Sequence, residues 1–178
     1  MFMFLERAAL DILIIFVSKL KALDHSQFLK SFKKEGVLTI KEGNGKNLTL
    51  MSQDQWTPAM GNDWIYLLFD LFQIRSVCEQ FSEVSLDIVE FASKPTIYHS
   101  DANKILSKGP IKEGVLKFSL IREPNWNKFL FQIAQPVLVQ LNSDRKAELK
   151  TDLYFPLFSS STKELYLGAE GEVKILKR

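Results

Sequence analysis

Two short apolar runs constrain the fold of this chain more than any other feature. Trp64 to Phe69 and Val137 to Leu141 each have the length of a β-strand and contain no charged residue. Continuous apolar strands are typical of sheets that are covered on both faces, as in α/β proteins. Segments of helical periodicity separate such runs, so the sequence predicts a single α/β domain.

The predicted elements alternate along the chain. Strands are expected at Val37–Ile40, Leu48–Met51, Trp64–Phe69, Val115–Ile121, Val137–Leu141, Lys163–Leu167 and Glu172–Leu176. Helices are expected between Asp24 or Ser26 and Gly36, near Phe72–Phe81, at Ser85–Ala92 and from Pro124 to Ile133. Because Gly168 to Gly171 separates the last two strands as a hairpin, the sheet is predicted to be mixed.

The composition narrows the classes of function. With 178 residues, of which 46% are hydrophobic, the chain can bury a core without disulfides or metals. The single cysteine, Cys78, excludes an intramolecular disulfide and a thiol-rich zinc site, and the two histidines do not indicate a metal site. The net charge of +2 is too small to indicate a nucleic-acid-binding protein by itself.

The first 23 residues form a separate apolar segment. Ile12 to Val17 is uninterrupted, and charged residues precede and follow it. This run is far shorter than the roughly 20 residues that a membrane-spanning helix requires. A secretory signal would place positive charge before the apolar stretch and a small-residue cleavage site after it. Here Glu6, Arg7 and Asp11 interrupt the stretch, and Lys19 and Lys21 follow it. We therefore expect an added apolar helix at 1–23, covered by the domain or by a partner, ahead of an α/β domain at 24–178.

Four segments of the chain, taken in order, resemble the YrdC-like family, the threonylcarbamoyl-adenylate synthases. They are Phe81–Thr96 with its Lys94-Pro95-Thr96 turn, Gly114–Pro124, Gln135–Val139 and Leu165–Lys177. In the family, the first segment corresponds to a helix and turn before the central strand, and the second to a strand that leads into a Glu-Pro helix start. The third corresponds to the strand that carries a Ser-x-Asn motif, and the fourth to the closing strand pair. The resemblance begins near Asp70 and implies the family's twisted mixed sheet flanked by helices.

The resemblance also implies an ancestral chemistry. Active enzymes of this family join L-threonine, bicarbonate and ATP into threonylcarbamoyl-adenylate, which is used in tRNA modification. That reaction needs an anion cradle for the triphosphate, cationic side chains against the developing charge, and short polar groups for threonine. ATP and magnesium are therefore expected as cofactors only if the ancestral cleft is retained.

The chain departs from the family at each of these places. Lys41–Gly45 stands where the family's Pro-Thr-Asp-Thr-x-Tyr-Gly loop should be, and Gly61–Asp63 replaces its Lys-x-Arg motif. The arginine of the family's Arg-Val-Pro-like strand falls on Ser119. The Ser-x-Asn motif falls on Leu141–Ser143, or places its asparagine on Asn142 if one residue is skipped. Losing these groups together removes most transition-state stabilisation, so a pseudoenzyme is predicted.

Six residues are the candidates for binding a nucleotide or RNA: Lys94, Thr96, Ser119, Asn142, Ser143 and Arg145. The first two belong to the best-matched turn, which borders the nucleotide cleft of the resembled enzymes. Pro95 also offers a purely structural explanation for this motif, because its restricted φ fixes how the chain enters the strand. The last three follow a buried strand at an end where α/β sheets often bind ligands, and a solvated loop is the alternative.

Three other features favour a structural interpretation. Gly43–Lys46 resembles a phosphate cradle but lacks the P-loop spacing, so a loop or hairpin turn is expected. His99 has no visible carboxylate or cysteine partner and is assigned no catalytic role. Acidic residues are interspersed among the basic ones, which favours a mixed surface over an RNA-binding face; the basic residues are Lys30, Lys33, Lys34, Lys146, Lys150, Lys174, Lys177 and Arg178.

The sequence therefore predicts a cytoplasmic, non-catalytic YrdC-like domain that binds a nucleotide, RNA or a partner protein, with no membrane contact and no metal site. Two alternatives stay open. One is an active, ATP-dependent threonylcarbamoyl-adenylate synthase-like enzyme with a rebuilt site. The other is an interaction protein that docks on a partner, or on a second copy as a homodimer, through its N-terminal helix.

Overall fold

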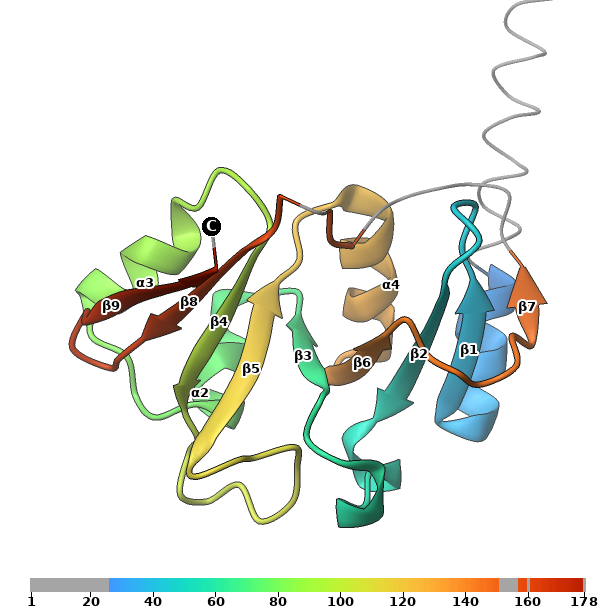
Figure 1. The fold of residues 1–178 in the computed structure, drawn as a ribbon, viewed down its shortest axis with the longest axis horizontal. Helices are drawn as coiled ribbons and strands as arrows, with labels where there is room; N and C mark the ends of the chain where they lie inside the picture. Colours follow the sequence, from blue (N-terminus) through green and yellow to red (C-terminus); the bar gives the residue numbers. More distant parts are fainter. Residues whose placement is uncertain (1–25, 151–156, 160, 178) are drawn as a thin grey trace, which may run out of the picture.

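The computed structural model describes residues 26–150, 157–159 and 161–177, and Figure 1 shows their arrangement. The predicted N-terminal helix at 1–23 lies outside these residues. Within the described ranges, no helix is long and apolar enough to cross a membrane.

Nine strands of the described residues form one twisted sheet (Figure 1). In chain order they are β1 (Val37–Lys41), β2 (Asn47–Ser52), β3 (Ile65–Leu68), β4 (Thr96–Asp101), β5 (Val115–Leu120), β6 (Val137–Leu141), β7 (Leu149–Lys150), β8 (Lys163–Leu167) and β9 (Val173–Lys177). Across the sheet their order is β7-β1-β2-β6-β3-β5-β4-β8-β9. The pairs β1–β7, β3–β5 and β4–β8 are parallel and the other neighbours are antiparallel, which confirms the predicted mixed sheet.

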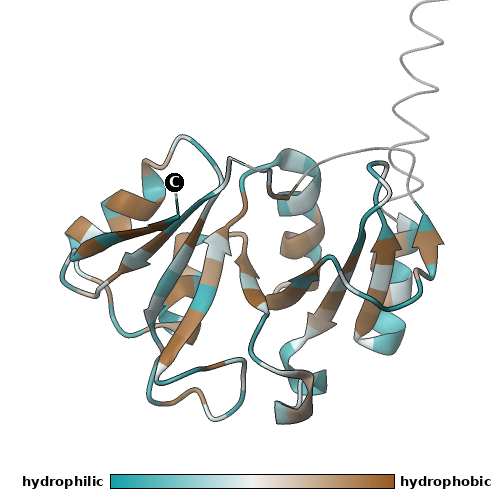
Figure 2. Ribbon diagram, viewed as in Figure 1, coloured by the Kyte–Doolittle hydropathy of each residue, from teal (hydrophilic) through white to brown (hydrophobic). Residues whose placement is uncertain are grey.

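Helices cover both faces of this sheet. They are a helix over residues 26–35, α2 (Ile74–Val77), α3 (Glu83–Glu90) and α4 (Pro124–Ile133), with 3-10 turns η1 (Gln53–Gln55), η2 (Pro58–Met60) and η3 (Leu71–Gln73). The helix over 26–35 and α4 bury Phe28, Phe32 and Phe129 against one face. Val77 of α2 and Val89 of α3 pack on the other face. Figure 2 shows hydrophobic colours concentrated on the strands between these two cores.

Local sequence signals set the ends of two helices. Pro124 occupies the first turn of α4, and the Glu123 carboxylate accepts a hydrogen bond from the Trp126 N–H at 2.8 Å. Gly36 ends the helix over 26–35 with a φ of 68°, and its N–H donates to the Phe32 carbonyl oxygen at 2.8 Å. Both ends agree with the sequence prediction.

The segment after β3 differs from the prediction. The sequence predicts a helix near Phe72–Phe81, whereas the structure has the turn η3 followed by the single-turn helix α2. The chain becomes extended at Cys78, which pairs with Ala102 just beyond β4. This pairing with Ala102 ends the helix early, because tertiary contacts outweigh helical periodicity over such a short segment. The two-residue strand β7 is also absent from the prediction.

The loop between β1 and β2 is the predicted hairpin turn. The Glu42 N–H donates to the Lys46 carbonyl oxygen at 2.9 Å, and the Gly45 N–H donates to the Glu42 carbonyl oxygen at 2.8 Å. The Lys46 N–H donates to the Asn44 side chain at 2.9 Å. These backbone N–H groups are satisfied within the turn, which removes the main argument for a phosphate cradle at this place.

Candidate functional site

The turn that joins α3 to β4 carries the best-matched candidate residues. Pro95 fixes the backbone before the strand, and the Thr96 hydroxyl donates a hydrogen bond to the Lys94 carbonyl oxygen at 3.1 Å. Thr96 is buried, whereas the Lys94 side chain is exposed and has no partner among the described residues. The turn therefore presents, on a fixed backbone, an exposed ammonium group that no described residue neutralises.

A pocket of about 340 Å³ lies beside this turn, and both Lys94 and Arg122 line it. Arg122 also holds the end of α3, because its Nη2 donates to the carbonyl oxygens of Val89 at 3.3 Å and of Glu90. A guanidinium group has five N–H donors, and these two bonds use a single nitrogen. Arg122 can therefore keep its structural contacts and still offer donors to a ligand in the pocket.

Glu123 brings a negative charge to the same pocket. Its Oε2 accepts a hydrogen bond from the Trp126 N–H at 2.8 Å, and its Oε1 accepts one from Asn125 Nδ2 at 2.7 Å. Both carboxylate oxygens are thus committed to the N-terminus of α4, where a negative charge is favourable. An anion at that helix end would have to displace Glu123, so the Lys94 side is the accessible cationic side of the pocket.

Ser119, at the position where the sequence resemblance predicts an arginine of the family, is fully buried in β5. Its hydroxyl donates a hydrogen bond to the Thr96 carbonyl oxygen at 2.8 Å. Since the single hydroxyl proton is used in this bond, Ser119 has no donor left for a ligand. Ser119 is thus a short side chain that is satisfied inside the sheet.

The candidates after β6 lie in another part of the structure. The Thr49 hydroxyl donates to Ser143 Oγ at 2.8 Å, and the Thr39 hydroxyl lies 2.9 Å from that of Thr49. Ser143 Oγ also accepts from the Arg145 N–H at 3.3 Å, and Asn142 turns the chain with a φ of 51°. The hydroxyl groups join β1, β2 and the end of β6, which gives Ser143 a structural role.

The six candidates therefore form two groups at opposite ends of the strands. β6 runs antiparallel to β3, β3 runs parallel to β5, and β4 runs antiparallel to β5. The end of β6, with Asn142, Ser143 and Arg145, consequently lies next to the start of β3. Lys94 and Thr96 lie next to the end of β5, where Ser119 joins them through its hydrogen bond.

Comparisons with known proteins identify the fold. No protein-family model matches the sequence, and no curated protein matches it. E. coli YciO superposes on the chain with a TM-score of 0.64 at 11% sequence identity, over 89% of each chain. Full-length HypF, solved in a phosphate- and nucleotide-bound form, superposes with a TM-score of 0.60 at 12% identity, over 84% of this chain and 28% of HypF. The chain has the YrdC-like fold.

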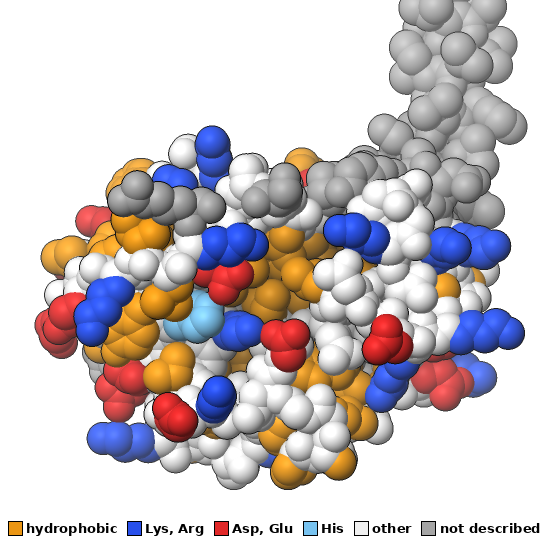
Figure 3. All heavy atoms as spheres, viewed as in Figure 1, with side chains coloured by type: hydrophobic (Ala, Val, Ile, Leu, Met, Phe, Trp, Pro, Cys, Tyr) orange, Lys and Arg blue, Asp and Glu red, His pale blue; other side chains and the backbone are white. Residues whose placement is uncertain are grey.

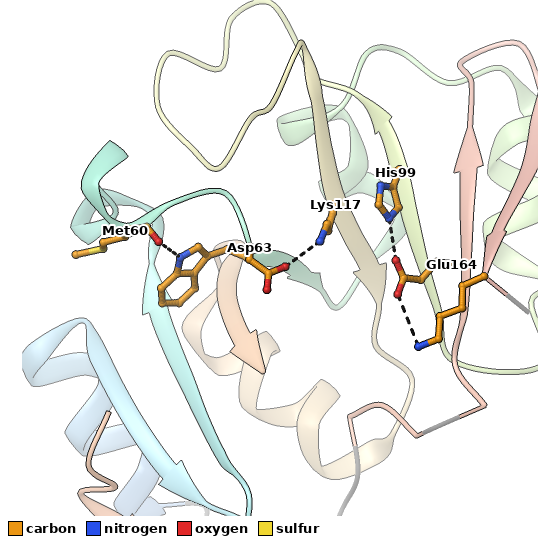
Figure 4. A network of polar contacts seen from close by, with 7 residues as sticks. Met60, Asp63, His99, Lys117 and Glu164 are labelled. Atoms are coloured by element: carbon orange, nitrogen blue, oxygen red, sulfur yellow. Dashed lines mark hydrogen bonds and ion pairs between the residues drawn. The ribbon is translucent and has the colours of Figure 1, made fainter. Parts of the chain in front are cut away.

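One face of this YrdC-like sheet carries a polar network that the sequence did not reveal (Figure 4). His99 Nε2 lies 3.1 Å from Glu164 Oε2, and Glu164 Oε1 lies 4.0 Å from Lys177 Nζ. On the next strand, Lys117 Nζ donates to Asp63 Oδ1 at 2.9 Å. The prediction that His99 has no carboxylate partner is therefore wrong.

The two partners are 65 residues apart in the sequence and meet through strand pairing. β4 pairs in parallel with β8, with His99 opposite Tyr166, so the flanking side chains of the two strands become neighbours. A pocket of about 560 Å³ lies beside His99 and Lys117. The acidic groups of the network are each paired with a basic group, so the network ties the strands of this YrdC-like fold together.

Burial raises the pKa of two side chains of the fold, Cys78 and Tyr98. It raises the pKa of the Cys78 thiol above its ordinary value, and the nearby Asp101 carboxylate adds to this effect. A protonated, buried thiol is a poor nucleophile. Burial also raises the pKa of the Tyr98 hydroxyl, which donates to the Ile88 carbonyl oxygen at 3.4 Å. Among the described residues, no group of three His, Cys, Asp or Glu side chains is placed to hold a metal ion.

Proposed function

We propose that this chain is a non-catalytic YrdC-like domain that binds the phosphate group of a nucleotide at the Lys94 turn. The exposed Lys94 side chain, which lines the 340 Å³ pocket and has no partner within the described part of the chain, is the main support for the proposal. Arg122 lines the same pocket, so two cationic groups flank a volume in the range of small-molecule sites. Charge-assisted hydrogen bonds from such groups are the usual means of holding a phosphate.

One structural neighbour supports a phosphate-bearing ligand by analogy. HypF has been solved in a phosphate- and nucleotide-bound form, and this chain superposes on 28% of it. Magnesium enters the proposal as the partner of the nucleotide, because the described residues provide no cluster of ligands for it.

The hydrogen bonds of the residues at the family's motif positions support the absence of catalysis. Ser119 and Ser143 stand where the family's catalytic motifs fall, and both hydroxyl groups are buried and hydrogen-bonded inside the fold. Stabilising a developing negative charge requires donors that are aimed at the reacting atoms. The Ser119 proton is used in its bond to the Thr96 carbonyl oxygen, and the buried Ser143 lies at the opposite end of the strands from the pocket. The pocket is therefore suited to binding rather than to transfer of the nucleotide.

The charge pattern on the face seen in Figure 3 favours a nucleotide over a long RNA. In Figure 3 the lysine and arginine side chains on the face shown are separated by acidic and uncharged ones. An RNA backbone is usually followed by a continuous stripe of cations. A single free lysine beside a small pocket favours one phosphate group with its attached nucleoside.

Thermal unfolding of the full chain with ATP–magnesium, AMP, inorganic phosphate and L-threonine tests the binding. A ligand at about a hundred times its dissociation constant adds roughly 2.7 kcal/mol to the free energy of unfolding, which raises the midpoint. We expect ATP–magnesium to raise it, Lys94→Ala to abolish the shift, and Lys33→Ala to preserve it. Lys33 is a matched control because it is also exposed and without a partner in the described structure.

Pyrophosphate release tests the absence of catalysis. The purified chain is incubated with ATP–magnesium, bicarbonate and L-threonine, and pyrophosphate is measured over time. We expect no release above the protein-free background. Release that disappears in Lys94→Ala would establish the alternative, an adenylate-forming enzyme with a rebuilt site. Salt-dependent binding of tRNA that Lys94→Ala leaves unchanged would overturn the choice of a nucleotide as ligand.

A further inference from the structure

A groove of about 1040 Å³ lies between α3 and the segment that connects β3 to α2; we call it the α3 groove. Its lining includes the apolar residues Phe69, Leu71, Ile74, Phe81, Leu86 and Leu120. Phe72 also lines it and is 72% exposed, although it is a large aromatic residue. An exposed aromatic side chain beside an apolar floor is typical of a surface that a partner covers.

One wall of the α3 groove is acidic. Glu83, Asp87 and Glu90 line it at positions i, i+4 and i+7 of α3, so they share one face of the helix. Their carboxylate groups have no partner among the described residues. Like charges at this spacing destabilise a helix unless cations neutralise them. Two arginines also line the groove, but Arg75 lies over the Phe72 ring and Arg122 is bonded to the carbonyl oxygens of Val89 and Glu90. With Asp70, the acidic residues of the lining outnumber the basic ones, so the groove is complementary to a segment that combines an apolar stripe with lysine or arginine.

Residues 1–23 of the chain itself have this composition. Seventeen of the 23 residues are apolar, and the segment contains the uninterrupted run Ile12–Val17. Lys19 and Lys21 follow this run directly. Burying the run along the groove floor would bring these two ammonium groups within the reach of the carboxylates on α3.

The point of attachment favours docking on a second copy. The helix over 26–35 packs on the sheet face that contains Phe28 and Phe32, at the β1 end of the sheet (Figure 1). The α3 groove lies on the opposite face, since Phe81 and Leu86 belong to the other core. Residues 1–23 would have to pass around the sheet to reach the groove of their own chain. Two copies can exchange these segments directly, and such an exchange closes with two-fold symmetry.

We propose that two copies of this chain associate by placing residues 1–23 of each copy in the α3 groove of the other. The apolar run covers the groove floor, and Lys19 and Lys21 pair with Glu83 and Asp87. The contact does not use Lys94, although Arg122 lines both the α3 groove and the pocket beside Lys94.

Sedimentation equilibrium of the full chain with two charge-reversed variants tests this exchange. The segment variant is Lys19→Glu/Lys21→Glu, and the groove variant is Glu83→Lys/Asp87→Lys. We expect the unmodified chain to sediment as a dimer, twice the chain mass of 20.5 kDa, and each variant alone as a monomer. An equimolar mixture of the variants should form a dimer again, because each segment then meets a groove of opposite charge.

Two controls distinguish a specific loss of the contact from a general effect of charge reversal or from unfolding. Lys30→Glu/Lys33→Glu reverses the same amount of charge on the helix over 26–35 and should leave the dimer intact. Thermal unfolding should show that both charge-reversed variants are folded. A monomeric unmodified chain would overturn the proposal, and so would variants that dimerise alone or a mixture that stays monomeric.

Discussion

Ser119 donates a hydrogen bond to the carbonyl oxygen of Thr96 at 2.8 Å, and this bond joins β5 to the first residue of β4. Both residues are buried. The sequence resemblance predicts that Ser119 stands where the YrdC-like enzymes have an arginine. This bond holds the Lys94 turn against β5.

Replacing Ser119 by alanine should destabilise the fold. The substitution leaves the buried Thr96 carbonyl oxygen without this donor, which costs about 1–3 kcal/mol of the free energy of unfolding. Urea denaturation measures the change, and Ser93→Ala on the exposed turn should cost much less. Equal stabilities of Ser119→Ala and the unmodified chain would contradict the structural role of Ser119.

Replacing Thr49 by valine should have a similar effect at the other end of the sheet. Valine keeps the shape of the side chain but removes the hydroxyl between Thr39 and Ser143. The buried hydroxyl groups of Thr39 and Ser143 then lose a partner, and we expect the free energy of unfolding to fall by about 1–3 kcal/mol. The exposed Thr57→Val is the control, measured by the same urea titration. A loss no larger than that of the control would show that the hydroxyl chain does not stabilise the fold.

The stability of the fold should decrease above pH 9 because of Cys78. Its pKa in the unfolded chain is close to 9.0, and burial raises it in the folded state. The unfolded state therefore loses its proton first, and the free energy of unfolding falls by up to about 1.4 kcal/mol per pH unit for this group. Tyr66 and Tyr98, whose pKa values burial also raises above 10.0, add to the loss at higher pH.

Urea titrations between pH 7 and pH 10 measure this dependence. Cys78→Ala should show a flatter profile between pH 9 and pH 10 than the unmodified chain, whatever its stability at pH 7. Identical slopes for the two proteins in that interval would mean that the Cys78 thiol does not hold its proton more tightly in the folded state.

Tyr66 should tolerate the loss of its hydroxyl group. This hydroxyl is buried and has no hydrogen-bond partner in the described structure. Tyr66→Phe should therefore leave the free energy of unfolding unchanged or raise it by about 1–3 kcal/mol, the cost of an unsatisfied buried group. Tyr98→Phe is the matched comparison and should be destabilising, because the Tyr98 hydroxyl donates to the Ile88 carbonyl oxygen. A clear loss of stability in Tyr66→Phe would disprove this description of its hydroxyl.

Much of the fold could be predicted because its central strands are covered on both faces. The apolar runs at Trp64–Phe69 and Val137–Leu141 correspond to β3 and β6, which lie side by side in the sheet. Pro124 and Gly36 mark helix ends by backbone properties that act locally. Such signals depend on neighbouring residues alone, so they can be read without the tertiary structure.

The parts that escaped prediction depend on which strands become neighbours. The contact of His99 with Glu164 requires the parallel pairing of β4 with β8, and no local sequence pattern predicts this pairing. Likewise, the six candidate residues separate into two groups because β6 runs antiparallel to β3. The early end of α2 at Cys78 also follows from a contact with Ala102, 24 positions further along the chain.

The central claim is that Lys94 binds the phosphate of a nucleotide, and calorimetric titration of ATP in magnesium buffer tests it most directly. The unmodified chain and Lys33→Ala should bind with the same affinity. Lys94→Ala should bind at least about tenfold more weakly, a loss of about 1.4 kcal/mol. Undetectable binding to the unmodified chain, or equal affinities of Lys94→Ala and Lys33→Ala, would contradict the account.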